Sequence, residues 1–463
     1  MLRRRGPHPQ GAAMHHRGMQ DPLREIVATA GNRRALIDRG AGFWISWMQL
    51  DELAQQWARR LHDAGARPGQ RVAVREPAGI RFAALLHACL RNELALVPIP
   101  VRAAPDDLER ILADSRPSLL VSDGEVSGLP DPELGELGDA SVCYTSGTSG
   151  SAKGVRLTLA NHLASARGCL EQLQASERDR WLLTLAPHHI GGLAIFIRAA
   201  LIGGSVVIVP RFVEDDVLQA IEEDGPTLLS VVPTMLERLL TAGGESRLRR
   251  LRAILVGGGP SSPDQVRSWT ERGLKVCPTY GSTETCSQIA IMPPGSAAGA
   301  PAAAGRVGPH AHVDIVEGEI VVSGPTVCAG YVNPALASPI RSGRLHTGDL
   351  GELRDGLLYA LGRLDDAINS GGEKIQPDEV ETVLKAHPRV DDAAVAGVDD
   401  PLWGQRVGAW IVGKASVEEL DAWCRERLPS FKIPRHWAVV DAIPRGEHGK
   451  VSRRSLGKPA PND

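Results

Sequence analysis

The spacing of hydrophobic positions predicts helices and strands in alternation over the first half of the chain. Leu53, Trp57 and Leu61 share one face of a helix that ends at Gly65, because every fourth residue of a helix points the same way. The elements expected after it are a strand at 71–74, a helix at 81–90, a strand at 95–99, a helix at 106–113 and a strand at 119–122. The alternation recurs over 161–255 and predicts parallel strands covered by helices.

The second half of the chain has a different pattern. Residues 295–305 (GSAAGAPAAAG) predict a low-complexity linker or surface loop. A small β-rich subdomain is expected next, with strands at 313–315, 319–322, 351–353 and 357–361, and then a shorter α+β unit from Asp366, with helices at 377–386 and 417–428. The predicted fold class is α/β: a large N-terminal domain of helix-covered mixed sheets with a β-rich subdomain, and a small α+β C-terminal domain.

Composition argues against several classes of protein. The chain has 463 residues, with 52 Lys and Arg against 55 Asp and Glu, so its charge of −3 does not indicate nucleic acid or an anionic membrane as a partner. No apolar run reaches the roughly 20 residues of a membrane-spanning helix. The 7 cysteines lack CxxC spacing, which argues against a zinc site or disulfide framework and favours a reducing, cytoplasmic location. Residues 1–20 lack the apolar core of a secretory signal and are expected to form a disordered leader.

A loop rich in glycine and hydroxyl groups is the strongest local motif. The stretch from Tyr144 to Gly154 reads YTSGTSGSAKG, and an apolar strand is expected on each side of it. Glycines let the backbone approach an anion closely, hydroxyl and N–H groups surround phosphate oxygens, and a lysine adds positive charge. It is not a Walker A motif, because Ala152 stands before the lysine and Gly154 after it. Taken alone, the stretch also fits a flexible polar hairpin loop. The candidate phosphate-binding residues are Thr145, Ser146, Gly147, Thr148, Ser149, Gly150 and Lys153.

Four further polar motifs follow this loop along the chain. Tyr280-Gly-Ser-Thr-Glu284 offers hard oxygen ligands for Mg²⁺ and a flat ring for a purine. His346-Thr-Gly-Asp349 supplies a carboxylate next to a turn, suited to a ribose diol. Gly362-Arg-Leu-Asp-Asp366 places a guanidinium and two carboxylates at the expected domain boundary, and Gly446-Glu-His-Gly-Lys450 places a lysine in a glycine loop. Each motif alone is more often a solvated loop.

Together the five motifs resemble those of the adenylate-forming superfamily, which comprises acyl- and aryl-CoA synthetases, nonribosomal-peptide adenylation domains and luciferases. The resemblance covers about residues 22–457. It implies an enzyme that uses ATP and Mg²⁺ to convert a carboxylic acid into an acyl-AMP, and then transfers the acyl group to coenzyme A. It also implies a mobile lid, with an N-terminal domain at 21–362, a hinge at 363–366, a C-terminal lid domain at 367–458 and a tail at 459–463.

The resemblance implies a role for each motif. The 145–153 loop is expected to hold the β- and γ-phosphates of ATP, with Thr148 and Glu284 at the Mg²⁺ and Thr283 at the α-phosphate. Lys450 is expected to bridge the carboxylate and the α-phosphate. The residues expected at adenine and ribose are Gly257, Gly258, Gly259, Pro260, Tyr280, Gly281, Asp349 and Arg363; Asp365 falls at the hinge position, and Gly371 and Gly372 belong to the surface of the thioester stage.

The chemistry explains why these residue types are needed. A carboxylate is a poor acyl donor, whereas attack of its oxygen on the α-phosphorus of ATP makes AMP the later leaving group. Negative charge develops during this attack, and Lys450 and Mg²⁺ are expected to stabilise it. Because one site then serves two reactions, a movable C-terminal domain is expected, and Lys450 is needed only for the first reaction.

Two stretches narrow the choice of acid. YGSTETCSQ at 280–288 and HHIGGL at 188–193, which Arg198 follows, are similar to those of the o-succinylbenzoate–CoA ligases of menaquinone biosynthesis. Such ligases bind an acid with two carboxylates, and Arg198 is expected to pair with the one that is not activated. Two plainer interpretations stay open: Arg198 extends to solvent, and His189 is a core histidine with a backbone partner. The expected substrate-binding residues are His189, Gly192, Arg198 and Ser282.

Other functions are compatible with the same motifs. In one alternative the substrate is another aryl or short acyl acid. In a second, the chain adenylates an acid and loads it onto a separate carrier protein. A luciferase-like oxidation also stays open. A catalytically inactive homologue is disfavoured, because Lys153, Glu284, Asp349 and Lys450 are all present. Lys374 and Gln376 depart from the SGGENIYP stretch common in these ligases, so details of the thioester-stage surface stay open. The expected partners are the acid, ATP and CoA, with no nucleic acid, and a homodimer is a candidate assembly.

Overall fold

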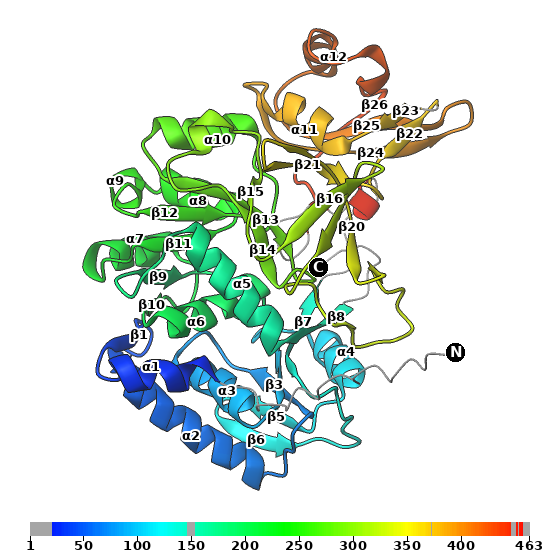
Figure 1. Ribbon diagram of the computed structural model, residues 1–463. Coiled ribbons are helices and arrows are strands. Elements are labelled where there is room, and N and C mark those ends of the chain that lie inside the picture. Colours follow the sequence, from blue (N-terminus) through cyan, green and yellow to red (C-terminus); the bar gives the residue numbers. More distant parts are fainter. Residues whose placement is uncertain (1–20, 146–152, 372, 446–450, 452, 457–463) are drawn as a thin grey trace, which may run out of the picture.

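The computed structural model describes residues 21–145, 153–371, 373–445, 451 and 453–456. Within these ranges the chain forms three β-sheets covered by helices, with the C-terminal elements grouped at one end (Figure 1). The predicted α/β class, with helix-covered mixed sheets and a small C-terminal α+β unit, is confirmed. The expected leader at 1–20 and tail at 459–463 lie outside the described residues. None of the described helices is long and apolar enough to cross a lipid bilayer.

The largest sheet in the described part of the chain has 14 strands and changes from parallel to antiparallel pairing at β13 and β14. This change coincides with the change of pattern along the sequence. In spatial order its strands are β16 (His312–Val316), β17 (Glu319–Ser323), β20 (Arg344–Arg354), β21 (Leu357–Arg363), β15 (Gly305–Val307), β14 (Ser287–Ile291), β13 (Val276–Ser282), β12 (Ala253–Val256), β11 (Leu228–Val231), β9 (Arg180–Leu183), β10 (Ser205–Ile208), β1 (Arg34–Asp38) and β2 (Phe43–Ser46), with β19 (Ile340–Arg341) paired to β20.

Two smaller sheets complete the fold that the described residues form. One has 7 strands and carries the edges of the expected phosphate loop; the other has 5 strands and belongs to the C-terminal unit. The first runs β18 (Gly330–Tyr331), β8 (Lys153–Thr158), β7 (Asp139–Thr145), β4 (Ala95–Pro98), β3 (Arg71–Arg75), β5 (Leu119–Ser122) and β6 (Glu125–Gly128). The second runs β23 (Glu373–Ile375), β22 (Ile368–Ser370), β25 (Gly404–Gly413) and β24 (Val390–Asp400), with β26 (His436–Val439) paired to β25.

Helices lie between the 14-stranded and the 7-stranded sheet and also cover the outer face of the 14-stranded sheet. Between the sheets, Leu85 of α3, Cys169 of α5 and Phe196 of α6 pack in one core with Val72 of β3 and Leu183 of β9. Helices α7, α8 and α10 cover the other face of the largest sheet (Figure 1). The helices are α1 (Pro22–Ala30), α2 (Trp47–Asp63), α3 (Ile80–Arg91), α4 (Pro105–Ser115), α5 (Leu159–Gln172), α6 (Ile190–Ile202), α7 (Glu214–Glu223), α8 (Pro233–Thr241), α9 (Glu245–Leu248), α10 (Pro263–Glu271), α11 (Pro377–Lys385) and α12 (Val417–Arg425), and three-residue 3₁₀ turns occupy Ala297–Gly299, Ser430–Lys432 and Arg453–Ser455.

The start of α5 ties the helix layer to the site. Thr158 caps the helix by accepting from the Asn161 N–H, while the Asn161 side chain accepts from the Thr158 N–H. Such a reciprocal capping box fixes a helix start. The Asn161 amide also donates to the carbonyls of Pro325 and Val327, at 2.8 and 2.9 Å. These bonds hold the segment that leads into β18 against α5.

Residues 295–305, expected to form a linker or surface loop, are irregular and partly exposed, with one 3₁₀ turn at Ala297–Gly299. Two of the alanines, Ala297 and Ala303, are nevertheless buried against the outer core of the largest sheet. Their small side chains allow the segment to pack closely, and Gly305 continues it into β15. The segment is thus a surface loop that two small side chains anchor to the core.

The C-terminal elements have a core of their own. Val380 and Leu384 of α11 pack with Val395 of β24, Ile411 of β25 and Leu420 of α12. Helix α11 lies against β21, so the unit adjoins the end of the largest sheet (Figure 1). The domain limits expected from the sequence stay a prediction.

Candidate active site

Three of the expected nucleotide-binding residues meet, although they come from β13, β20 and β21. Asp349 and Arg363 are cross-strand partners in β20 and β21. Arg363 Nη1 donates to Asp349 Oδ1 at 2.9 Å and to the Thr347 carbonyl at 3.0 Å. The Tyr280 hydroxyl donates to the second carboxylate oxygen of Asp349 at 2.6 Å. A flat ring, a carboxylate and a guanidinium therefore lie together, as a nucleoside-binding site requires.

The electrostatics of this group keep its charges and donors fixed. Burial and the neighbouring charge of Asp349 raise the pKa of Tyr280 well above its ordinary value, so its hydroxyl stays protonated. Burial alone would lower the pKa of Arg363, but the negative charge of Asp349 outweighs it and the pKa is raised. Arg363 Nε is enclosed and has no hydrogen-bond partner among the described residues. The Nε–H donor of the guanidinium is therefore unused.

Glu319 holds the segment that carries Asp349, a role the sequence did not predict. Its carboxylate accepts from the Gly348 N–H at 2.9 Å and lies 2.8 Å from His346 Nδ1. Thr347 Oγ1 adds support by accepting from the Asp349 N–H at 3.0 Å. The Asp349 carboxylate was expected beside a turn, with a strand beginning only at 351. In the structure the whole motif from His346 to Asp349 lies within β20. That longer strand, paired with β17, brings Glu319 to the motif.

The glycine stretch that begins at Gly257 directly follows β12. A Cβ atom on Gly257 would lie 2.2 Å from Thr279 Oγ1, so only glycine fits this close approach to β13. Gly258 has φ +77°, in the left-handed region that favours glycine. Thr279 directly precedes Tyr280 in β13. The glycine stretch, which also contains Gly259 and Pro260, therefore begins beside the strand that carries Tyr280, as expected for a loop near adenine.

Glu284 and Lys153 both lie close to Tyr331, a residue that the sequence did not single out. The Tyr331 hydroxyl donates to Glu284 Oε1 at 3.1 Å, and Lys153 Nζ lies 5.4 Å from the centre of the Tyr331 ring. Lys153 is the register partner of Thr145, so the two flank the expected phosphate loop. Tyr331 arrives there because β18 pairs with β8. The expected loop residues Ser146, Gly147, Thr148, Ser149 and Gly150 lie outside the described residues.

The donor set near Glu284 fits a Mg²⁺ ion that arrives with ATP. The described part of the chain contains no group of three or more His, Cys, Asp or Glu side chains able to hold a metal. Mg²⁺ commonly binds through one or two carboxylates together with substrate phosphates and water. The half-buried Glu284, with the Thr283 hydroxyl next to it in the chain, suits this mode and not a permanent metal centre.

We expect Gly281→Ala to displace the turn that carries Thr283 and Glu284. A methyl group at position 281 would lie 2.2 Å from the Ser287 carbonyl oxygen, a backbone atom of β14. The hairpin of β13 and β14 would have to open, at a cost of about 1–3 kcal/mol. Thermal melting and ATP titration should show a lower Tm and weaker ATP binding. Gly299→Ala is the control, because no atom lies within 4 Å of its added methyl group; equal behaviour of the two variants would contradict this account.

Arg198 is buried and does not extend to solvent. Its exposed fraction is 1%, and Nη2 donates to Ser287 Oγ at 3.1 Å and to Gln288 Oε1 at 2.9 Å. The guanidinium also lies over the Trp181 ring, 5.3 Å from its centre. The interpretation that Arg198 reaches solvent is therefore wrong, and its pairing with a substrate carboxylate stays a prediction. Ser287 and Gln288 stand in the quoted motif but were not singled out, because nothing local connects them to α6.

The other expected acyl-pocket residues lie at the start of α6 and at the end of β13. His189 is the half-buried residue before α6, with its ring 4.0 Å from the His188 ring. A Cβ atom on Gly192 would lie 2.4 Å from the Ala186 carbonyl oxygen, so glycine is required there. The Ser282 N–H donates to Thr285 Oγ1 at 2.8 Å. The substrate-binding roles of His189, Gly192 and Ser282 stay predictions.

His162, buried near Arg198, should make stability depend on pH. Its Nε2 lies 2.8 Å from Ser141 Oγ, and burial together with the charge of Arg198 lowers the pKa of His162 to about 4. The unfolded chain takes up this proton near pH 6.5. The stabilisation that depends on a neutral His162 is therefore fully present above pH 6.5 and is lost as pH falls toward 4. The loss in the free energy of unfolding is on the order of 3 kcal/mol.

Chemical denaturation at pH 7 and pH 4.5 measures this dependence. His162→Gln should show a smaller loss of unfolding free energy between the two pH values than the unchanged protein. His312→Gln, whose side chain is 72% exposed, serves as the control and should keep the full loss. Equal losses in the protein and in His162→Gln would show that His162 is not responsible.

The residues expected at the hinge and at the thioester stage are only partly described. Asp365 is exposed, and its Oδ2 lies 3.6 Å from Arg363 Nη2. Gly371 has φ +59°, and its added Cβ would lie 2.3 Å from the Trp403 ring. Gly372 and Lys450 lie outside the described residues. The roles expected for these residues stay predictions.

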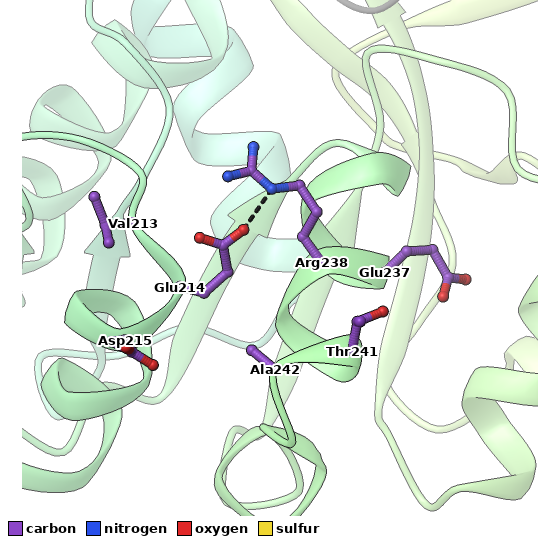
Figure 2. A pocket seen from close by; sticks show the side chains of 7 residues that line it. All are labelled: Val213, Glu214, Asp215, Glu237, Arg238, Thr241 and Ala242. Carbon is purple, nitrogen blue, oxygen red and sulfur yellow. Dashed lines mark hydrogen bonds and ion pairs between the residues drawn. The ribbon is translucent and has the colours of Figure 1, made fainter. Parts of the chain in front are cut away.

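A surface hollow of about 450 Å³ lies between α7 and α8, apart from these residues. The Arg238–Glu214 ion pair crosses it, with Nε and Oε1 2.5 Å apart (Figure 2). No residue that lines it was expected in the site, so it is not assigned to the nucleotide. Its lining residues are Val213, Glu214, Asp215, Glu237, Arg238, Thr241 and Ala242.

Two family models match the chain over most of its length. The model described as AMP-binding enzyme matches residues 23–140 and 129–332, and the model described as AMP-binding enzyme C-terminal domain matches residues 379–450. The chain belongs to the AMP-binding enzyme family. The resemblance to adenylate-forming enzymes is thereby confirmed. The first match covers the motifs at 144–154 and 280–284, and the second covers the motif at 446–450.

Relatives and solved structures with this family's fold match nearly the whole chain. The 2-succinylbenzoate–CoA ligase of Bacillus cereus (strain AH820) is 35% identical over 447 residues, which cover 89% of this chain and 93% of the relative. The o-succinylbenzoate CoA synthetase of Bacillus subtilis in complex with the acyl-adenylate intermediate OSB-AMP is 32% identical, with a TM-score of 0.86 over 96% of this chain and 99% of that one.

The TM-scores also differ between complexes of the Bacillus subtilis enzyme. A double mutant of it, bound with its product analogue OSB-NCoA, is 31% identical to this chain and has a TM-score of 0.69 over 95% of this chain and 98% of that one. The overall arrangement of the AMP-binding chain described here is therefore closer to the acyl-adenylate complex than to the product-analogue complex.

Proposed function

We propose that this chain is an AMP-forming ligase that joins 2-succinylbenzoate to coenzyme A through an acyl-adenylate, as a step of menaquinone biosynthesis. The observation that carries the proposal is its 35% identity to a 2-succinylbenzoate–CoA ligase over 89% of the chain. The nucleotide-binding group around Asp349 and the buried Arg198 supply two features that such a reaction needs. The cosubstrates are ATP and CoA, and Mg²⁺ accompanies ATP.

The proposed reaction has two steps at one site. First, a carboxylate oxygen of the acid attacks the α-phosphorus of ATP, the bond to the bridging oxygen breaks, and pyrophosphate leaves. Second, the CoA sulfur attacks the acyl carbon, AMP leaves, and the thiol proton is released. Mg²⁺ supplies positive charge to the phosphate oxygens when bound. In this proposal Asp349 and Arg363 bind the ribose hydroxyls, Tyr280 lies against adenine, and Lys450 assists the first step.

A dicarboxylic acid suits the charge at Arg198. Among the described residues, its hydrogen-bond acceptors are the neutral side chains of Ser287 and Gln288, and it forms no ion pair. A buried positive charge without a counter-ion is costly, by several kcal/mol. The carboxylate of the substrate that is not activated would supply the missing negative charge. Benzoate or a fatty acid would leave it unpaired.

Product analysis by mass spectrometry tests the proposal. The purified protein is incubated with ATP, Mg²⁺ and CoA, and with 2-succinylbenzoate, benzoate, a medium-chain fatty acid or an amino acid. We expect a CoA thioester from 2-succinylbenzoate alone. A thioester from a different acid would refute the proposed substrate, and AMP with pyrophosphate but no thioester would indicate a carrier protein as the acceptor.

Two further predictions from the sequence belong to this proposal. A homodimer is a candidate assembly, and the cytoplasm is the expected location. Size-exclusion chromatography with light scattering measures the mass of the particle in solution. A mass near that of one chain would contradict the candidate dimer.

A further inference from the structure

The environment of Arg198 is built from neutral acceptors at close range. Helix α6, which carries Arg198, lies against β14, which carries Ser287 and Gln288. Arg198 Nη2 is bound to both of these side chains, and the guanidinium is supported by the Trp181 ring. Because guanidinium has five donors and no acceptor, the Gln288 amide must present its oxygen to Arg198.

The orientation of Gln288 is fixed from three sides. Its Nε2 donates to Cys169 Sγ at 3.3 Å, and the Ser287 hydroxyl donates to its Oε1. His310 Nε2 lies 3.1 Å from the Gln288 carbonyl oxygen and so anchors the backbone at this position. Gln288 itself is buried, with an exposed fraction of 9%. The amide therefore holds Arg198 Nη2 in place without adding charge.

The rest of the guanidinium is not satisfied by the described residues. Nε is enclosed and has no partner, and Nη1 makes no hydrogen bond to any described residue. The nearby His162 is neutral near pH 7, because its pKa is lowered to about 4. Nothing described therefore cancels the positive charge of Arg198, and Nη1 keeps its donors without a partner among the described residues.

We propose that Gln288, supported by Ser287, is a positioning and specificity-determining residue that holds Arg198 in place while leaving its charge free for the second carboxylate of the substrate. This inference rests on the proposed function. A glutamate at position 288 would place a carboxylate at the same distance from Nη2 and cancel the charge, although it has almost the same shape as glutamine. The neutrality of Gln288 thus decides whether a second carboxylate is recognised.

The test compares two substrates with three proteins: the unchanged chain, Gln288→Glu and Ser287→Ala. The substrates are 2-succinylbenzoate and its monomethyl ester at the carboxylate that is not activated. For Gln288→Glu we expect the KM for the diacid to rise roughly 10- to 100-fold, the range that one hydrogen bond to a charged group is worth. The kcat for the diacid and the kcat/KM for the ester should change less than about threefold. Ser287→Ala should raise the diacid KM by a smaller factor and leave the ester unaffected.

Three outcomes separate this inference from its alternatives. Equal losses with both substrates would mean that Gln288 only holds β14 to α6, and would overturn the inference. An unchanged preference for the diacid in Gln288→Glu would overturn it as well. If the unchanged protein does not use 2-succinylbenzoate at all, the proposed function itself fails. Gln265→Glu, in the capping box of α10, is the matched control and should behave as the unchanged protein; thermal melting verifies that each variant is folded.

Discussion

We expect Asp349→Ala to raise the KM for ATP by roughly 100-fold, because it removes a carboxylate at the centre of the proposed nucleotide site. Asp349 accepts from Tyr280 at 2.6 Å and from Arg363 at 2.9 Å, so the substitution also leaves both donors without their partner. The Arg363 guanidinium would keep its hydrogen bond to the Thr347 carbonyl but would be held less firmly at the proposed ribose site. The measurement is ATP–pyrophosphate exchange in the presence of 2-succinylbenzoate over a range of ATP concentrations.

The control for this variant is Glu352→Ala on the same strand. Glu352 also carries a carboxylate, but its side chain is 45% exposed and, among the described residues, pairs with Arg354 alone. We expect its KM for ATP to stay within about twofold of the unchanged value, as is usual for a surface ion pair. An Asp349→Ala protein that is folded and binds ATP as well as this control would remove Asp349 from the nucleotide site.

Lys450→Ala is expected to slow acyl-adenylate formation by roughly 100- to 1,000-fold, the usual cost of losing one group that stabilises transition-state charge. Lys450 ends the region matched by the C-terminal family model, at 379–450. The same variant should convert supplied acyl-AMP and CoA to thioester at nearly the unchanged rate, because the lysine is proposed to act only in the first reaction. Both half-reactions can be followed by single-turnover kinetics.

Lys414→Ala provides the comparison, since Lys414 is an exposed lysine of the same C-terminal unit. It should leave both half-reactions unchanged. A Lys450→Ala protein that is slow in both reactions would show that the lysine is needed for more than adenylation. One that is slow in neither would show that another cation stabilises the first transition state.

The local sequence pattern was sufficient to predict most helices and strands, but it did not predict the contacts between them. The strand expected at 119–122 is β5, and the helix expected at 81–90 is α3 within one residue at each end. Period and turn residues determine such elements locally. The β20 strand was underestimated because its first half, His346 to Asp349, contains a glycine and polar residues that resemble a turn.

The site residues could be predicted only where a motif carried them. Tyr280, Asp349 and Arg363 were expected together because each stands in a recognisable motif. Glu319 and Tyr331 were missed, because each reaches the site through strand pairing and neither stands in such a motif. For Arg198, the sequence left open whether the side chain extends to solvent or pairs with a substrate carboxylate. Only its packing against β14 decides the matter, and no local pattern encodes that packing.

The most direct test of the account is the fate of the α-phosphate. ATP labelled at the α-phosphorus is mixed with the protein, Mg²⁺ and 2-succinylbenzoate, first without CoA and then with it. We predict a labelled acyl-AMP bound to the protein in the first stage, and labelled AMP together with 2-succinylbenzoyl-CoA in the second. Labelled ADP, with phosphate released in place of pyrophosphate, would contradict the adenylate mechanism and with it the function proposed for this chain.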